Sequence, residues 1–153
     1  MKHIIYTPRM KKHIYDINYD ISFQNLYIHN LYHDISFTHD KYINTELKKK
    51  FSSYKQQDKL KRKYDPELHI TYSEMINQLY ECGLKCYYCK CDVLIVYNQK
   101  NDMTQWSLER FNNNIGHYNN NTCIACLKCN LQRRTDNHEY FKWSKQINIT
   151  RTN

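Results

Sequence analysis

Four of the seven cysteines in this chain form two Cys-x-x-Cys pairs, which are the residues best placed to do chemistry. Cys86 pairs with Cys89, and Cys126 pairs with Cys129. This spacing lets two thiolates of one tight turn occupy adjacent corners of a tetrahedron around Zn²⁺. Two such pairs complete a four-sulfur site that leaves no position for water or substrate. We therefore predict a structural Zn²⁺ bound by these four side chains.

Three further cysteines, Cys82, Cys91 and Cys123, stand outside this pattern. An odd total fits disulfide pairing poorly, and paired cysteines in a reducing compartment are typical of metal sites. Cys91 could replace Cys89 as a ligand, but the Cys86-x-x-Cys89 spacing preserves the geometry of the turn. We interpret the three as packing or incidental thiols.

The 153 residues carry a formal net charge of +8 and give a pI near 9.1. This balance favours an anionic partner, most commonly nucleic acid, although it also fits a soluble basic protein without one. Much of the hydrophobic fraction comes from 15 tyrosines, so we expect a thin aliphatic core that a metal helps to stabilise. The sequence has no long apolar run and no apolar start of signal-peptide type. We expect an intracellular protein with no membrane partner.

The segment between the two pairs, residues 90–125, exceeds the roughly 15–20 residues of a plain zinc ribbon. We predict a strand at residues 92–97, a second strand at residues 106–111 and an Asn-rich loop at residues 112–121. A helix then begins near Cys126. These elements indicate an α+β fold, a small ββα-metal module pinned by the zinc at both ends.

A helix is also predicted just before the first cysteine pair. Thr71 and Glu74 form a capping box, in which each side chain accepts a hydrogen bond from the backbone amide of the other residue. Gly83 is placed to end this helix in the left-handed conformation. The apolar stripe of the helix consists of Met75, Ile76, Leu79 and Tyr80.

The chain before this helix divides into two segments by composition. Residues 1–47 are rich in Tyr and His, and we expect a β-rich or irregular N-terminal arm. The evidence for strand is a period-two alternation of apolar residues at Ile17, Tyr19, Ile21 and Phe23. Residues 48–66 form a basic linker or helix that ends at a proline. Residues 67–153 are then the zinc domain.

Together these motifs resemble the HNH endonucleases, also called ββα-metal or His-Me finger nucleases. The resemblance covers about residues 71–143 and is closest to the zinc-stabilised branch that includes viral and phage HNH proteins and recombination endonucleases. Beside the four cysteines it is carried by Ser107-Leu108-Glu109-Arg110, Gly116-His117, Asn120 or Asn121, and Asn130.

The resemblance implies that Glu109 and Asn130 hold a catalytic Mg²⁺ or Mn²⁺, for which their oxygen atoms are suitable donors. Arg110 stands where the family places its general-base His, and a guanidinium cannot act as a base near neutral pH. His117 is then the best candidate for the base, because imidazole titrates near neutrality; alternatively, it shapes the loop or touches phosphate. Arg110 is either a phosphate clamp that stabilises the transition state or part of a structural salt bridge.

Two basic groups are candidates for contact with nucleic-acid phosphates. On the helix after the last cysteine the candidates are Arg133 and Arg134. In the basic run before it they are Lys59, Lys61, Arg62 and Lys63, although such a run can also be a solvated face.

The favoured function is a divalent-metal-dependent endonuclease that hydrolyses phosphodiester bonds in DNA. One alternative is a catalytically inactive protein that keeps the fold and the zinc for nucleic-acid binding, or as a structural component of a nucleoprotein assembly. The presence of Arg110 keeps that alternative open. A second alternative is a protein-interaction zinc domain of the treble-clef type, which would not require Glu109, His117 and Asn130 together.

Overall fold

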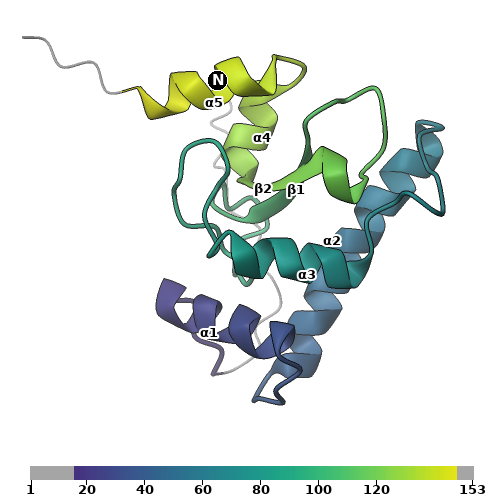
Figure 1. Ribbon diagram of the computed structural model, residues 1–153. Helices are drawn as coiled ribbons and strands as arrows, with labels where there is room; N and C mark the ends of the chain where they lie inside the picture. Colours follow the sequence, from purple (N-terminus) through teal and green to yellow (C-terminus); the bar gives the residue numbers. More distant parts are fainter. Residues whose placement is uncertain (1–15, 148–153) are drawn as a thin grey trace, which may run out of the picture.

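A two-stranded antiparallel sheet followed directly by a short helix forms the centre of the structure, a computed structural model that describes residues 16–147 (Figure 1). Strand β1 (Trp106–Arg110) pairs with β2 (Thr122–Cys126), so that Trp106 lies opposite Cys126 and Arg110 lies opposite Thr122. Helix α4 (Leu127–Arg133) begins where β2 ends. The fold is therefore mixed α+β, with its only regular sheet among the described residues in this hairpin.

The hairpin confirms one predicted strand and corrects the other. Residues 106–110 form β1 as expected, and the helix after Cys126 is also present. The strand predicted at residues 92–97 is wrong, because this segment makes only isolated bridges. Its apolar side chains are buried in the core, while the Ile95 and Val96 amides donate to Oε1 of Gln24 at 2.7 and 2.9 Å. A side chain thus takes the place of a partner strand, and the second strand is formed by residues 122–126, directly after the predicted loop.

Helix α3 (Tyr72–Glu81) begins with the predicted capping box. The Glu74 amide donates to Oγ1 of Thr71 at 3.1 Å, and the Thr71 amide donates to Oε2 of Glu74 at 2.8 Å. Gly83 follows the helix with a φ of 60°, which is the left-handed conformation expected there. The buried side chains of α3 are Met75, Ile76 and Leu79.

The N-terminal arm is helical rather than β-rich or irregular over the residues that the structure describes. Helix α1 spans Ile21–Tyr32 and helix α2 spans Asp40–Leu60, so α2 includes most of the predicted basic segment 48–66 but only Lys59 of the basic run. Residues 1–15 of the predicted arm lie outside the described residues. The period-two pattern was misleading because the buried positions of α1 are Gln24, Tyr27 and Ile28, which follow the spacing of a helix.

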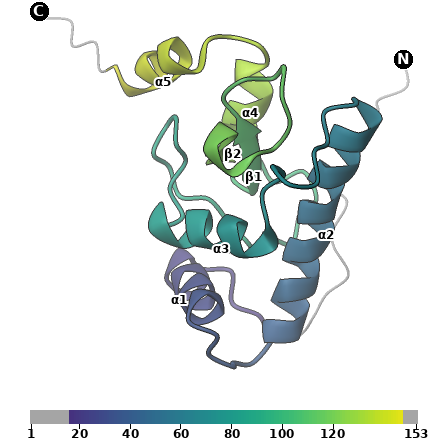
Figure 2. The same cartoon turned by 45° about the vertical axis from the view of Figure 1, so that its right-hand side comes forward.

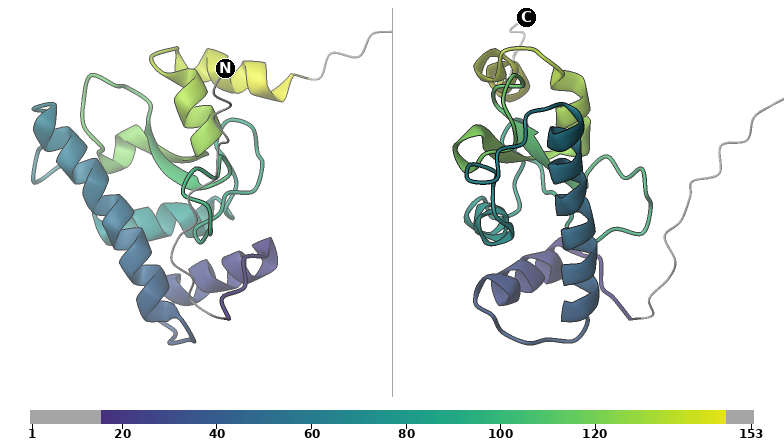
Figure 3. Two further views of the ribbon diagram at one scale, coloured as in Figure 1. Left: turned by 180° about the vertical axis from the view of Figure 1, so that it is seen from behind. Right: turned by 90° about the vertical axis from the view of Figure 1, so that its right-hand side faces the viewer.

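The helices surround the hairpin on several sides. Helix α3 lies between the hairpin and α1, and the long α2 runs obliquely past them (Figures 1 and 2). Helix α5 (His138–Gln146) follows α4 at the opposite end of the molecule from α1 (Figure 3). A 3-10 turn, η1 (Asn119–Asn121), leads into β2. None of the helices within residues 16–147 is long and apolar enough to cross a membrane.

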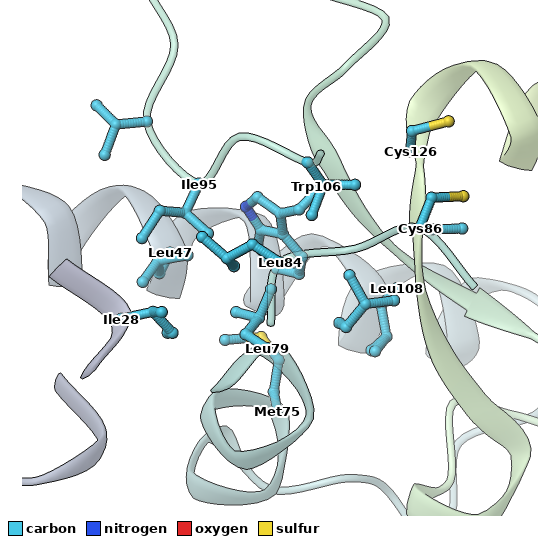
Figure 4. Close-up of a cluster of buried hydrophobic side chains, with 14 of the residues drawn as sticks. Ile28, Leu47, Met75, Leu79, Leu84, Cys86, Ile95, Trp106, Leu108 and Cys126 are labelled. Carbon is cyan, nitrogen blue, oxygen red and sulfur yellow. The ribbon is translucent and has the colours of Figure 1, made fainter. Parts of the chain in front are cut away.

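One hydrophobic cluster joins these elements. Ile28 of α1 and Leu47 of α2 pack in the same cluster as Trp106 and Leu108 of β1 (Figure 4). Because α1 and α2 contribute to it, the N-terminal helices and the cysteine-containing part share one core. Cys86 and Cys126 belong to the same buried cluster (Figure 4).

The loop between β1 and β2 contacts the C-terminal end of α2 closely at Gly116. A Cβ atom on Gly116 would overlap the carbonyl oxygen of Lys63 and lie 2.8 Å from Oδ2 of Asp58. It would also lie 3.0 Å from the ring of Tyr118. Gly116 is thus needed for close approach, because two of these neighbours are a backbone carbonyl and a fully buried carboxylate.

We predict that Gly116→Ala lowers the free energy of unfolding by about 3 kcal/mol, because the added methyl group overpacks a rigid contact. The control is Gly83→Ala, where a Cβ meets nothing within 4 Å and only the left-handed backbone is strained. That strain costs about 1 kcal/mol. Urea denaturation of the zinc-loaded proteins measures both. A loss at Gly116 no greater than that at Gly83 would contradict the close contact.

Candidate functional site

The four cysteines of the two Cys-x-x-Cys pairs converge on one point. The Sγ atoms of Cys86, Cys89, Cys126 and Cys129 all lie within 4.8 Å of one another, and Cys89 alone is more than slightly exposed. Within residues 16–147, no other group of three or more His, Cys, Asp or Glu side chains meets in this way. The cluster could hold a structural metal ion such as zinc, as the sequence predicts.

Each pair is shaped by its own local structure. In the first pair, the Lys90 amide donates to the Cys86 carbonyl at 3.0 Å, and Lys90 adopts a φ of 62°, which closes a tight turn. In the second pair, Cys126 is the N-cap of α4 and its sulfur accepts from the Cys129 amide at 3.4 Å. A helix N-terminus favours negative charge, so this position suits a thiolate ligand.

The other three cysteines are not members of the cluster. The Sγ atom of Cys91 lies 3.1 Å from that of Cys89, on the exposed side. Cys82 and Cys123 line a separate pocket beside α3. Burial raises the pKa of both of these thiols, so they stay protonated at neutral pH.

A second site lies on the other side of the hairpin, in a pocket of about 480 Å³ between the end of α2, β1, the β1–β2 loop and α4. All four residues predicted for catalysis line it: Glu109, Arg110, His117 and Asn130. Three of the predicted phosphate contacts also line it: Lys61, Lys63 and Arg134. The fold thus brings together side chains that come from four separate segments.

Glu109 is a buried carboxylate with one unsatisfied oxygen. The residue is 4% exposed, and Oε1 accepts from Nη1 of Arg133 at 2.8 Å and from the Arg110 amide at 3.0 Å. Oε2 is buried without a hydrogen-bond partner. Burial raises the pKa of Glu109 to about 7, against the opposing effect of Arg133. A buried carboxylate oxygen without a donor is costly, so the site is suited to receive a cation.

Arg133 is occupied within the protein. Besides Glu109, its guanidinium donates to the carbonyl oxygens of Asp136 at 2.9 Å and Phe111 at 2.6 Å, and also to that of Arg110. The residue is 2% exposed. The prediction that Arg133 contacts phosphate is therefore wrong, because its donors hold the end of β1 against α4. The neighbouring Arg134 is exposed and faces the pocket as part of its lining.

Arg110 braces the β1–β2 loop. Its Nη1 atom donates to the carbonyl oxygens of Ile115 at 3.1 Å and Asn113 at 3.5 Å, and lies 4.0 Å from Oδ1 of Asp58. These contacts correspond to the structural role that the sequence left open. The side chain is 11% exposed and still forms part of the pocket wall.

The asparagines of the site have distinct contacts. Asn130 donates from Nδ2 to Oγ of Ser107 at 3.1 Å, and that hydroxyl donates to the Ala125 carbonyl at 2.8 Å. The hydrogen bond to Ser107 orients the Asn130 amide through its nitrogen and does not use its oxygen. Asn121 is buried and donates to the carbonyl oxygens of Asn112 and Gly116, both at 3.0 Å. Asn121 therefore closes the loop and is not part of the pocket lining.

His117 is held by a carboxylate that the sequence analysis missed. Its Nδ1 lies 2.8 Å from Oδ1 of Asp58, and its backbone amide donates to Oδ2 at 2.6 Å. Burial lowers the pKa of His117 to about 4 despite the opposing effect of Asp58, so the imidazole is neutral at pH 7. A signal for Asp58 exists in the sequence, because it continues the buried helical face of Ile43, Leu47 and Tyr54.

Only part of the basic run lies at the pocket. Lys61 and Lys63 line the pocket, and Nζ of Lys63 donates to the Asn113 carbonyl. Lys59 and Arg62 are exposed and lie outside the lining, and Nζ of Lys59 lies 5.2 Å from the centre of the Tyr64 ring. Only the first two are therefore placed to contact a ligand in this pocket.

Comparisons of the chain with protein-family models, with curated proteins and with solved structures found no match. The HNH resemblance consequently rests on the motifs of this sequence, and its functional implications are taken up below as a proposal.

We predict that the purified protein contains about one zinc per chain, measured by elemental analysis. Cys126→Ser should lose that zinc and much of the thermal stability, because metal-binding energy is folding energy in such a site. Cys91→Ser is the control and should keep both, since Cys91 lies outside the four-sulfur cluster. A full zinc complement in Cys126→Ser would overturn the assignment.

Proposed function

We propose that the protein is a divalent-metal-dependent endonuclease that hydrolyses phosphodiester bonds in DNA. The observation that supports this most is the pocket in which Glu109, Arg110, His117 and Asn130 lie together under a basic rim. The sequence offered these four residues on three separate motifs, so their meeting in one cavity was not guaranteed by the spacing. A cavity with a carboxylate, an amide, an imidazole and surrounding cations suits phosphoryl chemistry.

Glu109 and Asn130 are the residues that would hold Mg²⁺ or Mn²⁺. Both offer oxygen donors, and the unsatisfied Oε2 of buried Glu109 is an atom that a cation would stabilise. When bound, such an ion polarises a phosphoryl oxygen and stabilises negative charge on the leaving oxygen. The four-cysteine cluster would have a different role, since a closed set of four sulfurs leaves no position for substrate.

His117 would act as the general base. With Nδ1 committed to Asp58, its Nε2 can accept a proton from water while the water oxygen bonds to phosphorus. The bond between phosphorus and the leaving oxygen of the DNA strand then breaks, and that oxygen takes a proton from solvent. Lys61, Lys63 and Arg134 would neutralise the flanking phosphates.

A DNA- or RNA-binding protein without catalysis is the second candidate, and two contacts favour it. One oxygen of Glu109 is already paired with Arg133, and the Arg110 guanidinium is engaged with loop carbonyls rather than free for phosphate. The two functions are distinguished by incubating the protein with duplex, branched and single-stranded DNA in Mg²⁺ or Mn²⁺. Binding without any cleavage would identify the inactive form.

We predict that Glu109→Gln abolishes cleavage while zinc content and DNA affinity remain those of the wild type. The substitution keeps an acceptor for Arg133 but removes the charge that a divalent ion needs. The matched control is Glu81→Gln, an exposed carboxylate at the end of α3, which should cleave normally. Wild-type cleavage by Glu109→Gln would exclude Glu109 as a ligand of the catalytic ion.

Neutralising the rim of the pocket should weaken DNA binding for all sequences. For Lys61→Gln/Arg134→Gln we expect the slope of log affinity against log salt to fall by about one unit per lost phosphate contact. The control, Lys41→Gln/Lys49→Gln, removes the same charge from the N-terminal half of α2, outside the pocket lining, and should change the slope less. Equal slopes in the two variants would show that the rim residues are ordinary solvated surface.

A further inference from the structure

We propose that Asp58 is a positioning residue that holds His117 in the tautomer whose Nε2 lone pair can accept a proton, an inference that rests on the proposed nuclease function. Asp58 lies on α2, outside the part of the chain that carries the HNH resemblance. The active site would then extend beyond the strand-strand-helix unit. The case rests on the contacts, the burial and the chain geometry around this carboxylate.

Both oxygens of Asp58 are used on the same residue. Oδ1 lies 2.8 Å from Nδ1 of His117, and Oδ2 accepts from the His117 backbone amide at 2.6 Å. An ionised carboxylate can only accept hydrogen bonds, so the proton of a neutral imidazole must sit on Nδ1. Nε2 then carries the lone pair. The two contacts fix both the tautomer and the orientation of the ring.

Two other polar side chains lie near Asp58 without replacing His117 as its hydrogen-bond partner. The carboxylate is fully buried, with Nε2 of His69 at 3.7 Å and Nη1 of Arg110 at 4.0 Å. Nδ1 of His69 donates to the Ile70 carbonyl at 2.8 Å, which places the His69 proton on Nδ1. Arg110 is thus the permanent positive charge near Asp58. Tyr54, also on α2, packs against the His117 ring with centroids 5.0 Å apart.

If Asp58 had a purely structural role, an apolar side chain would fill its position at lower cost. Asp58 occupies a position on the buried face of α2 where Ile43 and Leu47 are apolar, and burying a carboxylate costs more than burying a hydrocarbon. In addition, the loop has a glycine at position 116, where a Cβ atom would crowd Oδ2 of Asp58, the oxygen that accepts from the His117 amide. A carboxylate aimed at an imidazole that lines the pocket is the arrangement that general-base catalysis uses.

The test combines a measurement of the tautomer with one of cleavage. Nitrogen-15 NMR of histidine-labelled, zinc-loaded protein should show wild-type His117 protonated on Nδ1 at pH 7. Asp58→Asn should lose this preference, keep zinc and DNA affinity, and slow cleavage by roughly 10²- to 10⁴-fold, the usual worth of general acid–base help. Combining Asp58→Asn with His117→Ala should cost no more than His117→Ala alone, because the two residues act as a unit.

The control is His69→Gln, which removes the other imidazole near Asp58 and should leave the His117 tautomer and the cleavage rate unchanged. An Nε2-protonated His117 in the wild type would overturn the proposal without any variant, as would cleavage by Asp58→Asn at the wild-type rate. If the wild type cuts no DNA at all, the nuclease function fails. The role of Asp58 in catalysis falls with it, while the tautomer still shows whether Asp58 orients His117.

Discussion

The convergence of four sulfur atoms is the constraint on which the rest of this structure depends. It joins the turn after α3 to the junction of β2 and α4, and so closes the chain around residues 90–125. Because the hairpin has only two strands, it has little independent stability in water. A metal ion bound by the four sulfurs would tie the C-terminal end of the hairpin to the preceding turn and so fix β1 and β2 against α3. The pocket on the other side of β1 depends on the same junction, because β1 and α4 form two of its walls.

The second organising feature is two buried carboxylates, Glu109 and Asp58, each with its own partner. Glu109 and Arg133 pair across β1 and α4, and Asp58 pairs with His117 across α2 and the loop. Buried pairs of this kind add less to stability than hydrocarbon would, but they restrict which arrangements satisfy every donor and acceptor. Arg133, which donates to Glu109 and three backbone carbonyls, specifies where β1 ends and where α4 lies.

Local patterns were the part of this fold that the sequence could predict. The capping box of α3, the two Cys-x-x-Cys pairs and β1 each depend on residues a few positions apart. The spacing of those residues in the sequence is therefore enough to predict them. The strand at residues 92–97 failed because its amides bond to Gln24, which lies 71 residues away from Ile95. Asp58 was missed for the same reason, since its partner His117 lies 59 residues on. Arg133 looked like a surface cation because burial of an arginine is decided by the carbonyls around it.

Helix α2 contributes to the pocket but lies outside the recognisable motif. Residues 71–143 contain all four cysteines, the hairpin and α4, but Lys61 and Lys63 of the cavity wall, and Asp58 behind His117, come from outside this range. The four-cysteine cluster and the complete cavity therefore draw on different lengths of chain. Under the proposed function, substitutions in the flanking helix could abolish or restore activity in evolution with no change in the motif itself.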